Sequence, residues 1–428
     1  MKTLTHRGIS CGIGGPPMIF RGIGGSPMIS RSIARPPMIF RGIGGSPMIF
    51  RGIGRWPMIF SLLLSHSLFA KERIQTQTPP PDQSKPRIEV CFVLDTTGSM
   101  GGLIEGAKQK IWSIANEMIS AKLTPQLKLG LIGYRDRGDE YVVKTFALSD
   151  DIDAMYGHLR DFKADGGGDT PESVNEALDE AIHKMPWTAD NKVLKIIFLV
   201  GDAPPHMDYP NSPKYPDLCR EAARKDLIIN TVQCGDMADT RPIWQEIAKL
   251  SEGNYVAIAQ SGNMQVVSTP MDKELASLNG RISKTLIPYG DVRLQREVRV
   301  KSEIAAAAPM AAMADRLSYN SKTGRGVQGG GELIDALNTS ELKLEAIDQK
   351  QLPEEFQKLD KSELQKRVDK ARGERAELQK KVTELSKKRE DYIAAENKRL
   401  AAEGKGNAFD AKVAETLKAQ AAKKGIVY

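Results

Sequence analysis

The sequence is short of the features that several large classes of protein require. It has four cysteines in 428 residues, too few and too scattered for a disulfide-stapled scaffold: Cys11, Cys91, Cys219 and Cys234. We expect Cys91 and Cys234 to be small buried residues, because each falls within or at the end of an apolar run. No uninterrupted run of about 18 apolar residues occurs, so we predict no mature membrane-spanning helix.

The pattern of a nucleic-acid-binding protein is also missing. Lysine and arginine number 61 against 54 aspartates and glutamates, which gives a formal net charge of +7 on a mixed surface. Aromatic residues make up 6% of the chain, and no basic run is interleaved with them. Hydrophobic residues make up 40%, enough to bury a core, and the length allows two or three domains.

Common catalytic motifs are scarce. Neither H-E-x-x-H nor C-x-x-C occurs, and the Gly-rich stretch 318–331 lacks the G-x-x-x-x-G-K-[ST] pattern of a phosphate loop. We therefore predict that the protein is not an enzyme.

A ten-residue unit recurs near the amino terminus, with Pro17, Pro27, Pro37, Pro47 and Pro57 in strict register. The regular prolines preclude a continuous helix, and each unit is too short to bury a face of its own. We expect residues 1–57 to be disordered, or the true start to lie downstream at Met48 or Met58. A membrane-active Ile/Phe/Arg repeat is the alternative.

Residues 48–70 resemble a secretory signal, because Arg51 and Arg55 precede an apolar core that ends at Ala70. Leu68 is a poor residue at the third position before that possible cleavage site. We expect export to the periplasm or the cell exterior, with a cytoplasmic location as the alternative. Residues 71–86 are polar and Pro-rich, typical of a tether.

The most informative stretch follows this tether. Residues 88–94 form a short run, apolar except for Glu89, that predicts a strand buried on both faces of a parallel sheet. Asp95, Thr97 and Ser99 alternate directly after it, so a tight loop can direct three side-chain oxygens to one point. Oxygen ligands suit a hard divalent cation. The simpler alternative is that Asp95 caps the next helix while Thr97 and Ser99 shape a turn.

Two further stretches complete a pattern. Residues 165–172 (DGGGDTPE) open a helical pattern, and the apolar strand 193–200 ends in Gly201-Asp202. Together with D-x-T-x-S, these stretches resemble the von Willebrand factor A domain over about 87–286. The resemblance implies a doubly wound, mostly parallel α/β sheet with a Rossmann-like arrangement. It also implies a metal-ion-dependent adhesion site for Mg²⁺ (or Mn²⁺ or Ca²⁺), with the ligands Asp95, Thr97, Ser99, Thr170 and Asp202.

The second loop of this predicted site is ambiguous, since Asp169 competes with Thr170 as the ligand. Thr97 stands where the family more often has serine, and it keeps the hydroxyl. The resemblance implies a protein-binding module whose cation accepts an acidic residue of a protein partner. His206 and Tyr209, in the loop after Asp202, are predicted partner contacts; for His206 a solvated loop histidine is the alternative.

The remaining third is predicted to be helical. Residues 287–331 are expected to form a helical and Gly-rich linker, and 332–428 a charged helical region ending in a helix at 409–426. A heptad seam runs from Leu364, with Arg375 and Arg389 at core-type positions. It predicts either a helical hairpin or a coiled coil that joins copies of the chain.

Two other functions follow from these patterns. A scaffold or regulatory subunit would recruit a partner to an oligomer built by the helical tail. A Mg²⁺-dependent phosphohydrolase would use Asp95 in a nucleophile loop, but Thr97 stands where that loop needs a second aspartate.

Overall fold

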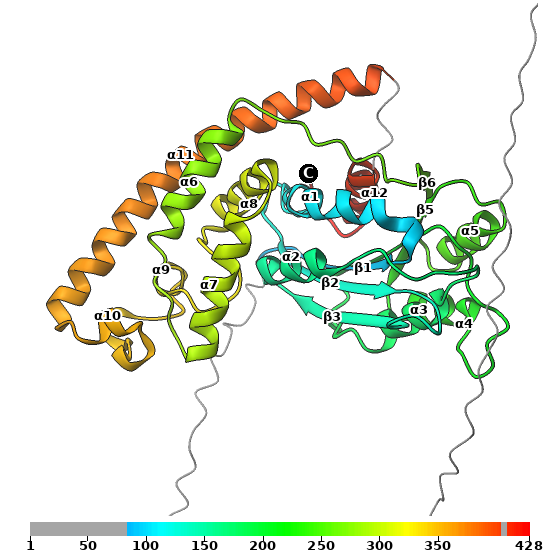
Figure 1. The fold of residues 1–428 in the computed structure, drawn as a ribbon, viewed down its shortest axis with the longest axis horizontal. Helices are drawn as coiled ribbons and strands as arrows, with labels where there is room; N and C mark the ends of the chain where they lie inside the picture. Colours follow the sequence, from blue (N-terminus) through cyan, green and yellow to red (C-terminus); the bar gives the residue numbers. More distant parts are fainter. Residues whose placement is uncertain (1–83, 404–408) are drawn as a thin grey trace, which may run out of the picture. The chain divides into compact units, whose positions relative to one another are not determined.

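The computed structural model describes residues 84–403 and 409–428 (Figure 1). The predicted repeats, the predicted signal at 48–70 and nearly all of the predicted tether lie outside the described residues. Of the helices within those two ranges, none has both the length and the apolar composition that a membrane crossing requires.

A six-stranded sheet forms the centre of the fold, in the order β3-β2-β1-β4-β5-β6. The edge strand β3 runs antiparallel to β2, and every other neighbouring pair is parallel. This confirms the predicted mostly parallel α/β fold. The strands are β1 (Arg87–Asp95), β2 (Gln126–Tyr134), β3 (Val143–Ser149), β4 (Leu194–Gly201), β5 (Ile228–Cys234) and β6 (Tyr255–Ile258).

Helices cover both faces of the sheet, which explains why β1 and β4 are mostly apolar and are buried along almost their whole length. One face packs against α1 (Gly101–Met118), α2 (Ile152–Asp161) and α12 (Phe409–Lys423). The other packs against α3 (Val174–His183), α4 (Tyr215–Arg224) and α5 (Thr240–Leu250) (Figure 1). Cys91 and Cys234 are buried free thiols, as predicted.

The last helix of the chain belongs to the first of these layers. The Phe409 ring lies 6.4 Å from that of Phe92 on β1. Gln420 and Asn230 of β5 exchange two amide hydrogen bonds, of 3.0 and 2.8 Å. Beyond the helix, the Tyr428 hydroxyl donates to the Met118 carbonyl at 2.7 Å. A segment more than 140 residues beyond β6 therefore completes the core of the sheet (residues 409–428 against a strand ending at Ile258).

Between β6 and α12 the chain forms a second group of helices, packed around α6 and α8. Its elements are α6 (Asp272–Ser283), α7 (Val292–Ala306), α8 (Met310–Thr323), α9 (Leu333–Asn338), α10 (Glu354–Gln357) and α11 (Lys361–Ala402). Short 3₁₀ turns occur at η1 (Gly98–Met100), η2 (Leu344–Ala346) and η3 (Gln349–Gln351). Buried Arg316 of α8 donates to Asp153 of α2 at 2.6 and 2.8 Å, joining this group to the sheet layer.

The stretch 318–331 differs from the predicted Gly-rich linker. Its first part completes α8, and Val327 and Gln328 in the rest are buried. The Asp335 carboxylate accepts hydrogen bonds from the backbone of Gly326 and Val327, which holds the glycines in place.

The predicted heptad seam is the buried face of one continuous 42-residue helix, α11, and not a hairpin. Its arginines are ion-paired inside the chain: Arg375 with Glu332 at 2.6 Å and Arg389 with Asp272 at 2.7 Å. The seam packs against α6, α8 and α9 of the same chain.

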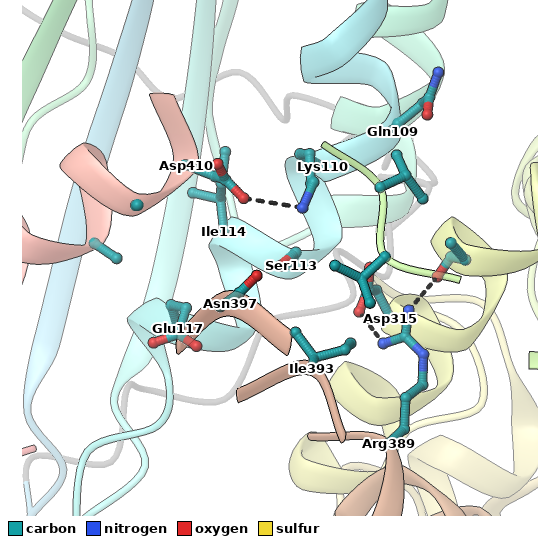
Figure 2. A pocket seen from close by; sticks show the side chains of 15 residues that line it. Gln109, Lys110, Ser113, Ile114, Glu117, Asp315, Arg389, Ile393, Asn397 and Asp410 are labelled. Carbon is teal, nitrogen blue, oxygen red and sulfur yellow. Dashed lines mark hydrogen bonds and ion pairs between the residues drawn. The ribbon is translucent and has the colours of Figure 1, made fainter. Parts of the chain in front are cut away.

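A cavity of about 250 Å³ lies where α1, α8, α11 and α12 meet. Figure 2 shows that four of its charged lining groups pair with one another, Lys110 with Asp410 at 3.0 Å and Arg389 with Asp315 at 2.5 Å. None of the predicted metal ligands lines it.

Candidate metal site

The first loop of the candidate site brings its three predicted oxygens together. Asp95 ends β1 and is fully buried, and its Oδ1 accepts hydrogen bonds from the Thr97 backbone N–H at 2.8 Å and hydroxyl at 2.6 Å. The Thr97 hydroxyl lies 3.3 Å from that of Ser99. The alternation of these residues after the strand therefore forms one cluster at the carboxyl edge of the sheet, where open α/β sheets bind ligands.

The second carboxylate oxygen of Asp95 differs from the first in its hydrogen bonding. Oδ2 is buried and has no hydrogen-bond partner among the described residues. A Cβ atom on Gly201, in the neighbouring strand β4, would lie 3.1 Å from this oxygen and 2.3 Å from the Tyr134 hydroxyl. Glycine at 201 therefore permits the close approach of strand, carboxylate and tyrosine. An unpaired buried carboxylate oxygen is costly unless a ligand satisfies it.

The third loop lies beside the first because β4 pairs with β1. Asp202 directly follows β4; its carboxylate accepts from Gln260 at 2.7 Å, and its carbonyl accepts from Thr240 at 2.8 Å. Burial raises the pKa of Asp95 to about 7, the Thr97 hydroxyl opposes the rise, and the adjacent Asp202 charge adds to it. The two aspartates that the sequence places at separate strand ends are thus close in space.

The Gly-rich second loop packs against the first. The Gly98 N–H donates to the Gly166 carbonyl at 3.2 Å, and the Asp165 N–H donates to the Thr96 carbonyl at 3.1 Å. Thr170 and Asp169 are both exposed, and in the described chain neither forms a hydrogen bond with Asp95, Thr97 or Ser99. The choice between them as the ligand stays a prediction.

Glu172 is a site residue that the sequence interpretation missed. It is 3% exposed, and its Oε2 is buried without a hydrogen-bond partner among the described residues. Burial and then the charges of Asp95, Asp136, Asp139 and Asp202 raise the pKa of Glu172 to about 9. Its place at the end of the Gly-rich stretch is the signal that would have found it.

His206 is buried rather than solvated, contrary to the expected alternative. Its ring stacks on Tyr209 with centroids 3.9 Å apart, and Nδ1 lies 2.7 Å from an Asp208 oxygen. Tyr209 is half-buried and donates its hydroxyl to Asp136 at 2.6 Å, while Arg137 stacks on its ring. These contacts fix the loop after Asp202; partner contacts by His206 and Tyr209 stay a prediction.

The donor set fits a hard divalent cation. Among the described residues, no group of three or more His, Cys, Asp or Glu side chains is arranged to hold a metal. The site instead offers two aspartates, two hydroxyls and two unpartnered buried oxygens, on Asp95 and Glu172. Arg135 beside the first loop donates to the carbonyls of Thr96 and Lys163 and not to these acids. An all-oxygen set of this kind suits Mg²⁺, Mn²⁺ or Ca²⁺.

Comparison with known proteins agrees with the fold. The family model of the von Willebrand factor A domain matches residues 89–270. Mouse von Willebrand factor A domain-containing protein 7 is 34% identical over 120 residues, 28% of this chain and 12% of that protein. A putative ariadne-like RING finger protein, R811, of Acanthamoeba polyphaga mimivirus is 23% identical over 209 residues, 45% of this chain and 20% of that protein. The chain thus spans a fifth or less of these curated relatives.

Solved structures also match part of the chain. The SpRpn10 VWA domain is 14% identical, with a TM-score of 0.32, covering 43% of this chain and 100% of that one. Proximal thread matrix protein 1 from the mussel byssus, solved with a zinc-occupied MIDAS motif, is 13% identical, with a TM-score of 0.33. The match covers 41% of this chain and 42% of that one.

The chain contains a von Willebrand factor A domain: residues 89–270 match that family, and the sheet has the mostly parallel order that the resemblance implied. Helices after the matched region extend the domain, and α12 packs on its sheet.

Proposed function

We propose that the A domain is a divalent-cation-dependent protein-binding module. In this proposal Mg²⁺, or Mn²⁺ or Ca²⁺ in its place, is held by Asp95, Thr97, Ser99, Thr170 and Asp202. The cation accepts an acidic side chain from a protein partner, and no bond is made or broken.

One observation carries the proposal: the buried, unpartnered Oδ2 of Asp95 lies in a cluster of side-chain oxygens at the carboxyl edge of the sheet. Mg²⁺ takes about six oxygens near 2.1 Å and keeps water wherever the protein leaves a position open. Hydroxyl ligands do not neutralise the ion, so an open position attracts a carboxylate. The ion would also compensate the repulsion between Asp95 and Asp202.

The test is partner retention by the immobilised full chain in Mg²⁺ and in EDTA. We expect a protein that is retained in Mg²⁺, released by EDTA and absent with Asp95→Ala. Asp236→Ala is the matched control, because Asp236 is an exposed aspartate just beyond the neighbouring strand β5. Retention that is equal in EDTA, or equal with Asp95→Ala, would contradict the proposal.

The structure lends less support to a scaffold that oligomerises through its helical tail. The apolar seam of α11 packs against helices of its own chain, and of the large apolar side chains in this helix only Tyr392 is exposed. A coiled coil between copies needs an uncovered seam.

A further inference from the structure

Glu172 is fixed by its backbone between two loops of the candidate site. Its N–H donates to the Pro204 carbonyl at 2.9 Å, and its carbonyl accepts from the His206 N–H at 3.0 Å. Pro204 and His206 belong to the loop that follows Asp202, so the second and third loops are joined at this residue.

The side chain of Glu172 lies beside the first loop. A Cβ atom on Gly167 would lie 2.7 Å from the Thr97 Cβ and 3.3 Å from the Glu172 Oε1. Both side chains therefore pack around the same glycine, whose φ of +70° suits glycine. The Glu172 carboxylate and the side chain of Thr97, a predicted metal ligand, thus lie against the same residue.

A second buried glutamate in the same chain, Glu332, shows which hydrogen bonds a buried carboxylate makes when its role is structural. Glu332 accepts from Arg375 at 2.6 Å and from the backbone N–H groups of Ile287 at 2.7 Å and Asp335 at 2.8 Å. Glu172 is about equally buried, at 3% against 2% exposure, yet its Oε2 has no hydrogen-bond partner in the described ranges. No structural contact of the Glu332 kind explains the burial of Glu172.

We infer that Glu172 is a further ligand of the cation at this site, an inference that rests on the proposed function. The unpartnered oxygens of Glu172 and Asp95 would both be satisfied by one ion. A carboxylate ligand adds negative charge beside the ion, and a larger ligand charge strengthens cation binding. Glu172 also takes a coordination position that the motif alone would leave open. The acid of a partner then enters by competing with a carboxylate of this chain.

The test is calorimetric titration of Mn²⁺ into the full chain and two variants. We expect Glu172→Gln to weaken binding by roughly tenfold or more, as the loss of a metal-site group typically does. Glu140→Gln is the matched control, because Glu140 lies near the first loop but its side chain is 79% exposed and 3.6 Å from Arg135. Its affinity should change by less than about twofold, as for a screened surface charge.

A second readout separates a ligand from a merely buried acid. Without metal, Glu172→Gln should raise the melting temperature, because it removes a buried carboxyl group whose ionised form no counter-charge stabilises. Adding metal should raise the melting temperature of the variant by less than it raises that of the wild type, because the variant binds the ion less tightly. Glu172→Met, which keeps the volume without an oxygen, should give the same pair of results if the glutamine variant does not fold.

The outcomes distinguish this inference from the proposed function. If the wild type takes up no Mn²⁺, the metal dependence of the proposed function fails, and the inference fails with it. If the wild type binds Mn²⁺ and Glu172→Gln binds it equally or more tightly, the role of Glu172 is overturned while the proposed function stands.

Discussion

At the scale of single residues, the candidate site is a group of acids held close together. Asp95 and Glu172 are both buried, and each has an oxygen without a hydrogen-bond partner among the described residues. The strand and loop geometry positions these groups, because β1 and β4 are neighbours and the Gly-rich loop is tied to the first loop. The folded protein therefore holds like charges together, at a cost that a cation would offset.

This arrangement predicts a pH dependence of the metal-free protein. The folded-state pKa values of Asp95 and Glu172 are raised from 3.8 and 4.5 to about 7 and about 9. The folded state therefore holds these protons more tightly than the unfolded state does. The stabilisation of the fold by these protons is fully present at a pH below the unfolded-state pKa values. It is lost as the pH rises through the folded-state pKa values.

Urea unfolding at about pH 5 and about pH 8 measures this loss. Glu172→Gln should show a smaller decline between the two conditions than the wild type, and Mg²⁺ should reduce the wild-type decline. A decline of the same size in the variant would show that Glu172 does not titrate in this way.

At the scale of helices, the account depends on α12 as part of the A-domain core. Phe409 is 2% exposed and packs near Phe92, three residues before Asp95. Its N–H donates to the Gly262 carbonyl at 3.0 Å, two residues beyond Gln260, the donor to Asp202. The end of the chain is therefore packed close to the strand and the loop that carry the site.

Phe409→Ala should lower the free energy of unfolding by about 3–5 kcal/mol, the usual cost of truncating a buried aromatic. Chemical denaturation followed by circular dichroism measures this cost. Tyr392→Ala is the control, because Tyr392 is 44% exposed on α11 and its loss should cost under about 0.5 kcal/mol. If Phe409→Ala costs no more than the control, α12 is not part of the cooperative core.

The buried ion pairs of α11 give a second expectation at this scale. Arg375 is 1% exposed and donates to Glu332, Asp335 and the Thr285 carbonyl. Arg375→Met should destabilise the fold by about 3–5 kcal/mol, because it leaves two buried acids without a counter-charge.

Thermal unfolding measures this loss of stability, and Arg399→Met is the control variant. Arg399 pairs with Glu396 on the exposed part of the same helix, and such surface pairs contribute about 0–1 kcal/mol. Removing one of these two acidic charges from the Arg375 variant with Glu332→Gln should recover part of the loss. No recovery would mean that packing, and not charge, dominates at Arg375.

At the scale of the whole chain, sequence patterns predicted the structural features that depend on residues close together in the sequence. The apolar runs predicted the buried strands β1 and β4, and the turn residues after them predicted two of the three loops of the site. These features are set locally, by periodicity and turn chemistry.

What the sequence did not reveal depends on contacts between distant residues. Asn230 and Gln420 are 190 positions apart, so α12 could not be assigned to the sheet layer from its own pattern. The partners of Arg375 lie 40 and 43 positions away, and without them the two arginines read as defects of a coiled coil. Glu172 read as part of a loop motif because its burial arises only when three loops meet.

The central claim is that oxygens from separate loops at one edge of the sheet bind a divalent cation. Calorimetric titration of Mg²⁺ into the full chain tests it most directly, with Asp95→Ala as the comparison. We expect the wild type to take up one ion and the variant to take up none. No uptake by the folded wild type, or equal uptake by Asp95→Ala, would contradict it.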